Sequence, residues 1–145
     1  FIRNERTSRN CFRSKFKRLQ KNICIAKKNL ELLSQDLKNL EYTKALRRPL
    51  FNKYINHNSH IYYILVKKKH RNNLIKFLKK NKINCTFHYQ ALHKSSFFIK
   101  NFSKKKIKLE ISENTQDKIL RLPLWNDMEI NEAEYVVKKI YKYFS

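Results

Sequence analysis

The chain has 145 residues, with 34 Lys and Arg against 11 Asp and Glu, which gives a net charge of +23, and it contains no glycine. Its length suits one domain, and 41% apolar residues with 13% aromatics are too many for a disordered tail. The lack of glycine excludes dinucleotide fingerprints, P-loops and nucleophile elbows, because each needs positive φ or a close backbone approach. No apolar run approaches the roughly 18 residues of a membrane span, so we expect no membrane partner.

The positive charge is weak evidence for a nucleic-acid partner. The enriched residue types (Lys, Asn, Ile, Phe and Tyr) share A/T-rich codons, so the base composition of the gene explains much of the charge. The cations are also scattered along the chain as 25 Lys and only 9 Arg, whereas base and phosphate readers rely on Arg. Nonspecific binding to nucleic acid at low salt is one alternative function.

Cys11, Cys24 and Cys85 form an odd set without a C-x-x-C pair. They predict neither a disulfide framework nor a zinc ribbon, and they favour the reducing cytoplasm as the compartment. The chain begins at Phe1 with an Arg-rich stretch that no apolar segment follows, so no signal peptide is expected. We expect that a segment upstream of Phe1 is missing.

The first predicted element is a long helix from Lys15 to Leu40. Apolar residues recur there at alternating spacings of three and four, namely Phe16, Leu19, Ile23, Ala26, Leu30, Leu33, Leu37 and Leu40. This heptad stripe must be buried, either against the strand–helix unit after His60 or against a second copy of the chain. The stripe favours a packing helix, and a helix-mediated interaction domain or homodimer is the alternative.

The predicted elements then follow in chain order. Residues 42–59 form a loop, the β-branched and aromatic run His60–Val66 forms a strand, and residues 67–70 form a polar turn. A helix over Arg71–Lys80 and a second strand over Ile83–Tyr89 come next.

The C-terminal part begins with a Ser/Lys-rich excursion over residues 94–108 and a short helix over residues 114–118. Pro123 makes residues 119–125 an edge strand or an extended loop. Asn131 is the expected N-cap of the last helix, with Glu129, Glu132 and Glu134 as helix-start charges. The expected buried residues of this helix are Ala133, Val136, Val137, Ile140 and Phe144.

Few residues suggest chemistry by themselves. The pairs His57/His60 and His88/His93 lack Cys or carboxylate neighbours at ligand spacing, so no metal site is predicted. Glu110 and Glu113 lie in a loop-like stretch and form no catalytic pair, and no catalytic residue is nominated. The aromatic residues of the strands are interpreted as core rather than as base-stacking side chains, namely Tyr62, Tyr63, Phe87 and Tyr89.

The order of the later segments carries more information. The run His60-Ile-Tyr-Tyr-Ile64, the loop Phe87-His-Tyr-Gln-Ala-Leu-His93, the segment Arg121-Leu-Pro-Leu-Trp125 and the closing helix resemble the C-terminal domain of the DegT/DnrJ/EryC1/StrS sugar-nucleotide aminotransferases. The opening Ile2-Arg-Asn-Glu-Arg-Thr-Ser-Arg9 looks like the stretch that follows the cofactor lysine in this family.

The resemblance implies an α/β (α+β) fold: the small C-terminal domain of an aspartate-aminotransferase-like enzyme that uses pyridoxal phosphate, preceded by a long helix. Intact relatives would transfer an amino group from glutamate to a dTDP-linked keto-deoxysugar. The resemblance also places His88, Tyr89 and His93 on the loop that faces the substrate. It divides the chain into a remnant of the large domain (1–14), the heptad helix with its linker (15–48) and the small domain (57–145).

The sequence also departs from the family pattern. None of its 25 lysines lies in the family's Schiff-base motif, so no covalent cofactor is expected and the chain is predicted to be inactive alone. Arg6 stands where the family carries Gly, and Ala91 stands where it carries Pro. Ser14 leads almost directly into the long helix, which implies an internal deletion. The chain is therefore expected to be a truncated or decayed relative.

Overall fold

The computed structural model describes residues 2–52, 54, 55, 57–102 and 107–145, and it describes side chains from Ser14 onward except that of Phe16. A three-stranded antiparallel sheet has the order β1-β2-β3, formed by β1 (Leu46–Arg47), β2 (Tyr62–Val66) and β3 (Ile119–Leu122). The helices are α1 (Ile2–Asp36), α2 (Lys38–Tyr42), α3 (Lys68–Lys80), α4 (Ser96–Phe102), α5 (Glu110–Gln116) and α6 (Ile130–Phe144), with a 3-10 turn at Leu92–Lys94. The expected α+β fold with a leading long helix is confirmed.

One face of the sheet is buried and the other is only partly covered. Tyr62, Ile64 and Val66 alternate with half-buried residues along β2, and Leu120 and Leu122 do the same along β3. The buried side chains belong to one apolar cluster with residues of α1, α3 and α6. Alternation of this kind is the signature of a sheet that packs helices on one side.

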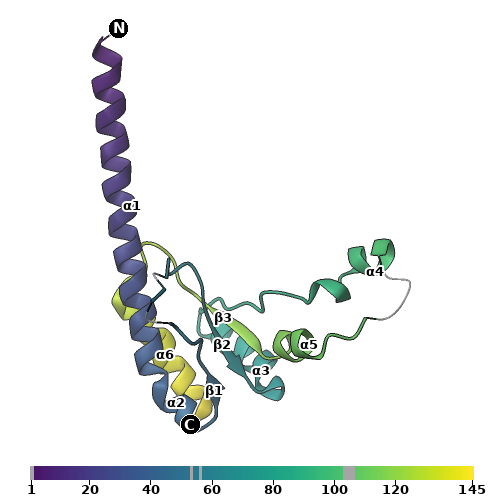
Figure 1. The fold of residues 1–145 in the computed structure, drawn as a ribbon. Coiled ribbons are helices and arrows are strands. Elements are labelled where there is room, and N and C mark those ends of the chain that lie inside the picture. The colour runs from purple at the N-terminus through teal and green to yellow at the C-terminus, as the bar shows by residue number, and fades with distance from the viewer. Residues whose placement is uncertain (1, 53, 56, 103–106) are drawn as a thin grey trace.

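Helix α1 contacts this cluster through residues 26–36, beside α6, and its N-terminal part projects from the body (Figure 1). Leu33 and Leu37 are fully buried, whereas Leu19 and Ile23 are 53% and 38% exposed. The prediction that the apolar stripe packs against the strand–helix unit after His60 is therefore confirmed for residues 26–40 alone. The backbone is helical from Ile2 onward, with no break near residue 15, and Phe16 lies outside the described side chains.

Arg48 forms hydrogen bonds with α1 and α2 at the point where the chain leads into the sheet. Its Nε donates to Glu41 Oε2 at 2.8 Å, and its Nη1 contacts the carbonyl oxygen of Ser34 at the end of α1. The bonds hold the residue that follows β1 against the helices. The segment expected to be only loop contains a two-residue strand because Leu46 and Arg47 pair with Val66 and Leu65.

Several predicted boundaries were wrong for local reasons. Helix α3 begins at Lys68, so the expected polar turn forms its first helical turn. Glu110 and Glu113 lie in α5 rather than in a loop, and α5 begins four residues before the predicted helix. Helix α6 is capped by Glu129 and Glu132, whose side chains form a capping box, so Asn131 is not its N-cap. Its predicted buried residues are confirmed except Phe144, which is half-buried.

The predicted strand over Ile83–Tyr89 was also wrong, because within it the structure forms a single bridge between Thr86 and Arg121. The next hydrogen-bonded pair of that ladder would match Asn84 with Pro123, which has no N–H to donate. Beyond Thr86 the chain leaves the sheet and leads to an arm, defined here as residues 92–102 and 107–109, which extends away from the body (Figure 1). In the described part of the chain, no helix is long and apolar enough to cross a membrane.

Candidate functional site

The bridge between Thr86 and Arg121 sets the geometry of the first candidate site. The N–H of Thr86 donates to the oxygen of Arg121 at 3.3 Å, and the N–H of Arg121 donates back at 2.8 Å. This pairing brings the loop that follows Thr86 beside the end of β3. As a result, Arg121 Nη1 lies 3.3 Å from His88 Nδ1.

The contact with Arg121 defines the chemistry of His88. A guanidinium group only donates hydrogen bonds, so His88 Nδ1 accepts, and the neutral ring then carries its proton on Nε2. Tyr89 stacks on the His88 ring at 4.5 Å between centroids and is 70% exposed. This part of the loop therefore presents an imidazole donor and a phenol, both suited to sugar hydroxyl or phosphate oxygens.

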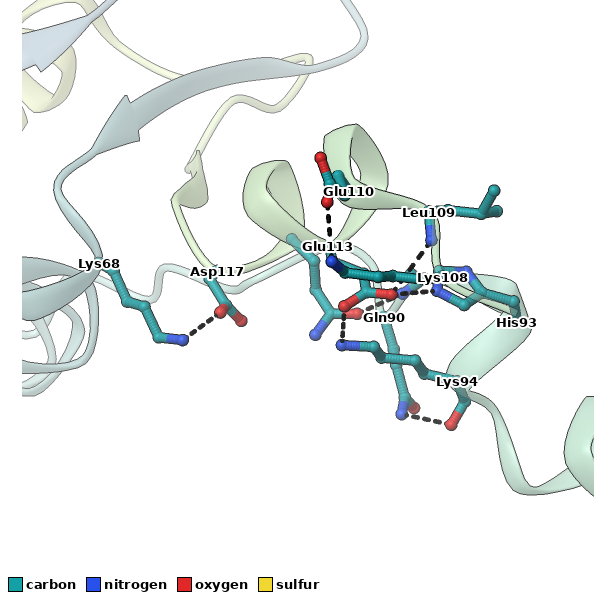
Figure 2. Close-up of polar contacts among 11 residues, drawn as sticks. Lys68, Gln90, His93, Lys94, Lys108, Leu109, Glu110, Glu113 and Asp117 are labelled. Carbon is teal, nitrogen blue, oxygen red and sulfur yellow. Dashed lines mark hydrogen bonds and ion pairs between the residues drawn. The ribbon is translucent and has the colours of Figure 1, made fainter. Parts of the chain in front are cut away.

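His93 belongs to a different cluster. Its side chain is 6% exposed, and its Nε2 lies 3.1 Å from Glu113 Oε1. The same carboxylate binds Lys94 Nζ at 2.7 Å and the backbone N–H of Leu109 at 3.2 Å (Figure 2). Bonds from Lys94, His93 and Leu109, in that order of effect, lower the pKa of Glu113 to about 2.

Glu113 thus joins both ends of the arm to α5, since His93 and Lys94 lie at its start and Leu109 at its end. Two further ion pairs flank α5: Lys68 with Asp117 at 2.5 Å, and the exposed pair Lys108 with Glu110 at 2.8 Å (Figure 2). The Lys68 contact lowers the pKa of Asp117. The His93 side chain therefore binds mainly to Glu113, whereas the His88 side chain contacts Arg121.

Two hollows adjoin these clusters. One of about 620 Å³ lies between the loop and α5 and is lined by Tyr89, His93 and apolar side chains of the arm. The other, of about 740 Å³, lies beside β3 and the start of α6 and is lined by Arg121, Trp125 and Tyr135 among others. Of the three side chains predicted to face substrate, Tyr89 and His93 share the smaller hollow and His88 contacts the lining of the larger one.

The lining of the larger hollow does not fit pyridoxal phosphate as a covalently held group. Lys82 is the only lysine among those lining the larger hollow, and its side chain is exposed; no aspartate is among the lining residues there. An internal aldimine needs an amine held inside a cofactor pocket. We therefore derive no catalytic step through the cofactor in this chain.

The other histidine pair also has local partners. His57 Nδ1 accepts the N–H of Ser59 at 2.8 Å within a turn. Across the described residues, no group of three or more His, Cys, Asp or Glu side chains is placed to hold a metal ion. The core interpretation is confirmed for Tyr62, which is fully buried, but it was wrong for Phe87 and Tyr89, which are 52% and 70% exposed.

The α+β arrangement with its leading long helix matches the smaller part of aminotransferase structures. The model of the "DegT/DnrJ/EryC1/StrS aminotransferase family" matches residues 7–141, so the chain belongs to this family.

Solved structures show the same fold. An aminotransferase from Psychrobacter cryohalolentis matches with a TM-score of 0.79 and 14% identity, over 91% of this chain and 36% of that one. The sugar aminotransferase CalS13 from Micromonospora echinospora matches with a TM-score of 0.70 and 11% identity, over 83% and 30% of the two chains. NtdA from Bacillus subtilis, solved with bound cofactor PMP, matches with a TM-score of 0.67 and 18% identity, over 84% and 27%. The chain spans about a third of the length of these relatives.

Sequence reasoning missed two residues that organise the site. Arg121 stood in the quoted Arg-Leu-Pro-Leu segment, and an arginine near the end of a strand, two residues before a proline, was an available signal. Glu113 had no local signal, because its partners His93 and Lys94 lie about twenty residues away in the sequence.

Proposed function

We propose that the chain forms the small-domain wall of the substrate site in a sugar-nucleotide aminotransferase, with His88 and Tyr89 contacting the sugar part of the substrate and His93 holding the loop. The observation that carries the proposal is the contact of Arg121 with His88 Nδ1, which leaves the Nε2 proton of a neutral ring available as a donor. Family membership supports amino transfer as the reaction class.

The finer substrate assignment rests on the resemblance. The Phe87–His93 loop and the Arg-Leu-Pro-Leu segment resemble those of dTDP-4-amino-4,6-dideoxygalactose transaminase, so we propose a dTDP-linked keto-deoxysugar as acceptor and glutamate as amino donor. Pyridoxal phosphate, the cofactor of this reaction class, supplies the electron sink when it is bound. We further propose that the reaction takes place in the cytoplasm and that this chain alone does not transfer amino groups.

The site assignment is tested by titrating the chain with dTDP-glucose, a stable analogue of the substrate, while recording the ring protons of its five histidines by NMR. The His88 resonances should shift in a saturable way, and His88→Gln should weaken binding about tenfold, the cost of one good hydrogen bond to substrate. His60→Gln is the matched control, because His60 is exposed and lines neither of the two hollows. Equal effects of the two variants would remove His88 from the site.

The reaction class needs a separate test, in which residues 46–145 replace the corresponding part of the Psychrobacter cryohalolentis aminotransferase. The chimera should transfer an amino group from glutamate to a sugar nucleotide, and His88→Gln should reduce that activity. The unmodified chain mixed with pyridoxal phosphate should show no borohydride-sensitive band at about 420 nm that maps to one lysine. A folded but inactive chimera, or such a band, would contradict the proposal.

A further inference from the structure

A third hollow lies at the end of the sheet where α2 leads into β1 (Figure 1). Its volume of about 440 Å³ lies in the range of small-molecule sites, roughly 300–1,000 Å³. At this end of the sheet, the N–H of Val66 donates to the oxygen of Lys118 at 3.0 Å. Arg121 pairs with Tyr63 nearer the other end of β2. The third hollow is therefore separate from the loop that contacts Arg121.

Cations dominate the lining of this hollow, which we call the basic hollow. Four of its nine described lining residues are basic, namely Lys44, Arg47, Lys67 and Lys118, and four others are apolar. In the part of the chain that the structure describes, none of the four basic side chains forms an ion pair. A concave surface with apolar walls and charges of one sign concentrates its electric field and attracts the opposite charge. The basic hollow is therefore suited to an anion.

The acid in the lining does not neutralise these cations, because it is bound from outside the hollow. Arg48 is not a lining residue, and its Nε and Nη2 lie 2.8 and 2.7 Å from Glu41 Oε2. The backbone N–H of Arg48 donates to Glu41 Oε1 at 3.1 Å. Asp117, which precedes Lys118 in the chain, is bound by Lys68 at 2.5 Å. Both carboxylates already have cationic partners, so the four cations of the hollow stay available to a ligand.

Backbone bonds bring the cations together from three separate segments. Arg47 lies opposite Leu65 in the pairing of β1 with β2, which ends one residue before Lys67. The N–H of Lys44 donates to the oxygen of Glu41 at 3.0 Å and fixes the turn that leads into β1. The fold itself therefore assembles the basic hollow, and no single run of lysines in the sequence forms it.

The high overall charge does not by itself produce such a lining. The hollow between the loop and α5 belongs to the same chain of net charge +23, yet no Lys or Arg is among its described lining residues. Scattered cations can thus leave one hollow free of basic side chains. Their concentration in the basic hollow is a local property of the α2–β1 turn and the sheet end.

We propose that the basic hollow binds a small anion with at least two linked phosphate groups. One phosphate is too small to contact four cations around a cavity of this size, whereas two linked phosphates can reach more of them. The guanidinium fork of Arg47 suits a pair of phosphate oxygens, and the lysines add point charges. The basic hollow lies away from His88, so this inference goes beyond the proposed function and does not depend on it.

Titration calorimetry with inorganic pyrophosphate tests the site at about 0.15 M salt, where charges more than about 8 Å apart are largely screened. We expect saturable binding at one site per chain, with inorganic phosphate at least about tenfold weaker. Arg47→Gln combined with Lys118→Gln should weaken pyrophosphate binding at least about tenfold. Arg18→Gln with Lys76→Gln is the matched control, because it removes the same two kinds of charge from exposed positions outside the hollow. The control should change the affinity less than about twofold.

A second double variant protects the test against damage to β1. Lys44→Gln with Lys67→Gln removes the other two cations and leaves the residues of β1 unchanged, and it should weaken binding to a similar extent. Circular dichroism spectra establish that each variant is folded. In the unmodified chain, pyrophosphate should shift the amide resonances of Lys67 and Lys118 in NMR spectra, with the affinity that calorimetry gives.

Absence of saturable pyrophosphate binding would overturn the site and leave its cations as charges that keep the edge strand β1 from pairing with another chain. Equal losses in the test and control double variants would show only general attraction of anions by a basic chain. Inorganic phosphate binding as tightly as pyrophosphate, or NMR shifts confined to the surroundings of Arg121, would also refute the assignment. A short DNA duplex should bind the test and control variants equally, and dependence on Arg47 and Lys118 would reassign the hollow to nucleic acid.

Discussion

The apolar stripe of helix α1 has two halves, a projecting half over residues 16–25 and a buried half over residues 26–36, which share the same spacing but lie in different surroundings. Leu30, Leu33 and Leu37 are at most 6% exposed against the sheet and α6, whereas Leu19 is 53% exposed on the half that projects from the body (Figure 1). Apolar spacing therefore predicts that a helix forms and which face it buries. It does not predict how far burial extends along the helix, because that depends on the neighbouring elements.

The largest effect is expected from placing two charges in the buried half. Leu30→Asp combined with Leu33→Asp should lower the free energy of unfolding by more than about 5 kcal/mol, since each change removes a buried leucine and buries a carboxylate. Urea unfolding followed by circular dichroism measures the loss. Leu19→Asp with Ile23→Asp is the matched control and should change the stability by no more than about 1 kcal/mol. Equal losses in both double variants would mean that the projecting half is also packed in solution.

The reactivity of two cysteines compares the projecting half of α1 with the core, and it needs no substitution of a buried residue. Cys24 is exposed on the projecting half of α1, and Cys85 is buried in the core, where burial raises the pKa of its thiol to about 12. In a Cys11→Ser background at pH 8, iodoacetamide should modify Cys24 faster than Cys85 by roughly a hundredfold or more, because Cys85 is both inaccessible and protonated. Peptide mass spectrometry follows each site. Similar rates at the two sites would show that the region around Cys85 opens readily.

A smaller effect is expected at the hydrogen bond that joins the buried half of α1 to the segment before α6. Asn29 is 1% exposed, and its Nδ2 donates to the carbonyl of Met128 at 2.7 Å. Asn29→Ala leaves that buried carbonyl without its donor and should cost about 1–3 kcal/mol in urea unfolding. Asn22→Ala, on the projecting half, should be neutral within about 0.5 kcal/mol. Equal costs would show that the bond contributes nothing specific.

Local patterns account for what could be predicted of the fold. The β-branched run that became β2 and the amphipathic spacing of α6 are properties of neighbouring residues, so they were visible in the sequence. Strand β1 was not visible, since its two residues are a strand only through pairing with Val66 and Leu65. The strand expected over Ile83–Tyr89 was wrong because only Thr86 pairs with β3; on the Asn84 side, the facing residue Pro123 has no N–H to continue the ladder.

The candidate site was predictable only in part. Resemblance to the family led to His88, Tyr89 and His93, but it did not separate their roles. The structure shows that His88 contacts Arg121 and that His93 contacts Glu113, two partners that lie far along the sequence from their histidines. Long-range pairs of this kind leave no trace in residue spacing, and the fold is needed to reveal them.

The smallest effect concerns the attachment of the arm, which Glu113 joins to α5 at both ends (Figure 2). Bonds from Lys94, His93 and Leu109 lower the pKa of Glu113 from 4.5 to about 2. Because the folded pKa is lowered, the attachment should be complete above pH 4.5 and lost as the pH falls towards 2. The amide proton of Leu109 should report this titration by NMR with a midpoint of about 2, and Glu113→Gln should abolish it.

At pH 7, Glu113→Gln should also speed amide exchange at Lys94 and Ser95, whose N–H groups bond within the turn that Glu113 fastens. Glu110→Gln is the control, because Glu110 and its partner Lys108 are both 77% exposed and their ion pair should contribute almost nothing. Exchange in the core strand β2 should be the same in both variants. Two outcomes would contradict the attachment: unchanged exchange in the arm of Glu113→Gln, or a titration midpoint at Leu109 that stays near 4.5. Either would mean that the three bonds to Glu113 do not form in solution and that the arm is held by its apolar contacts alone.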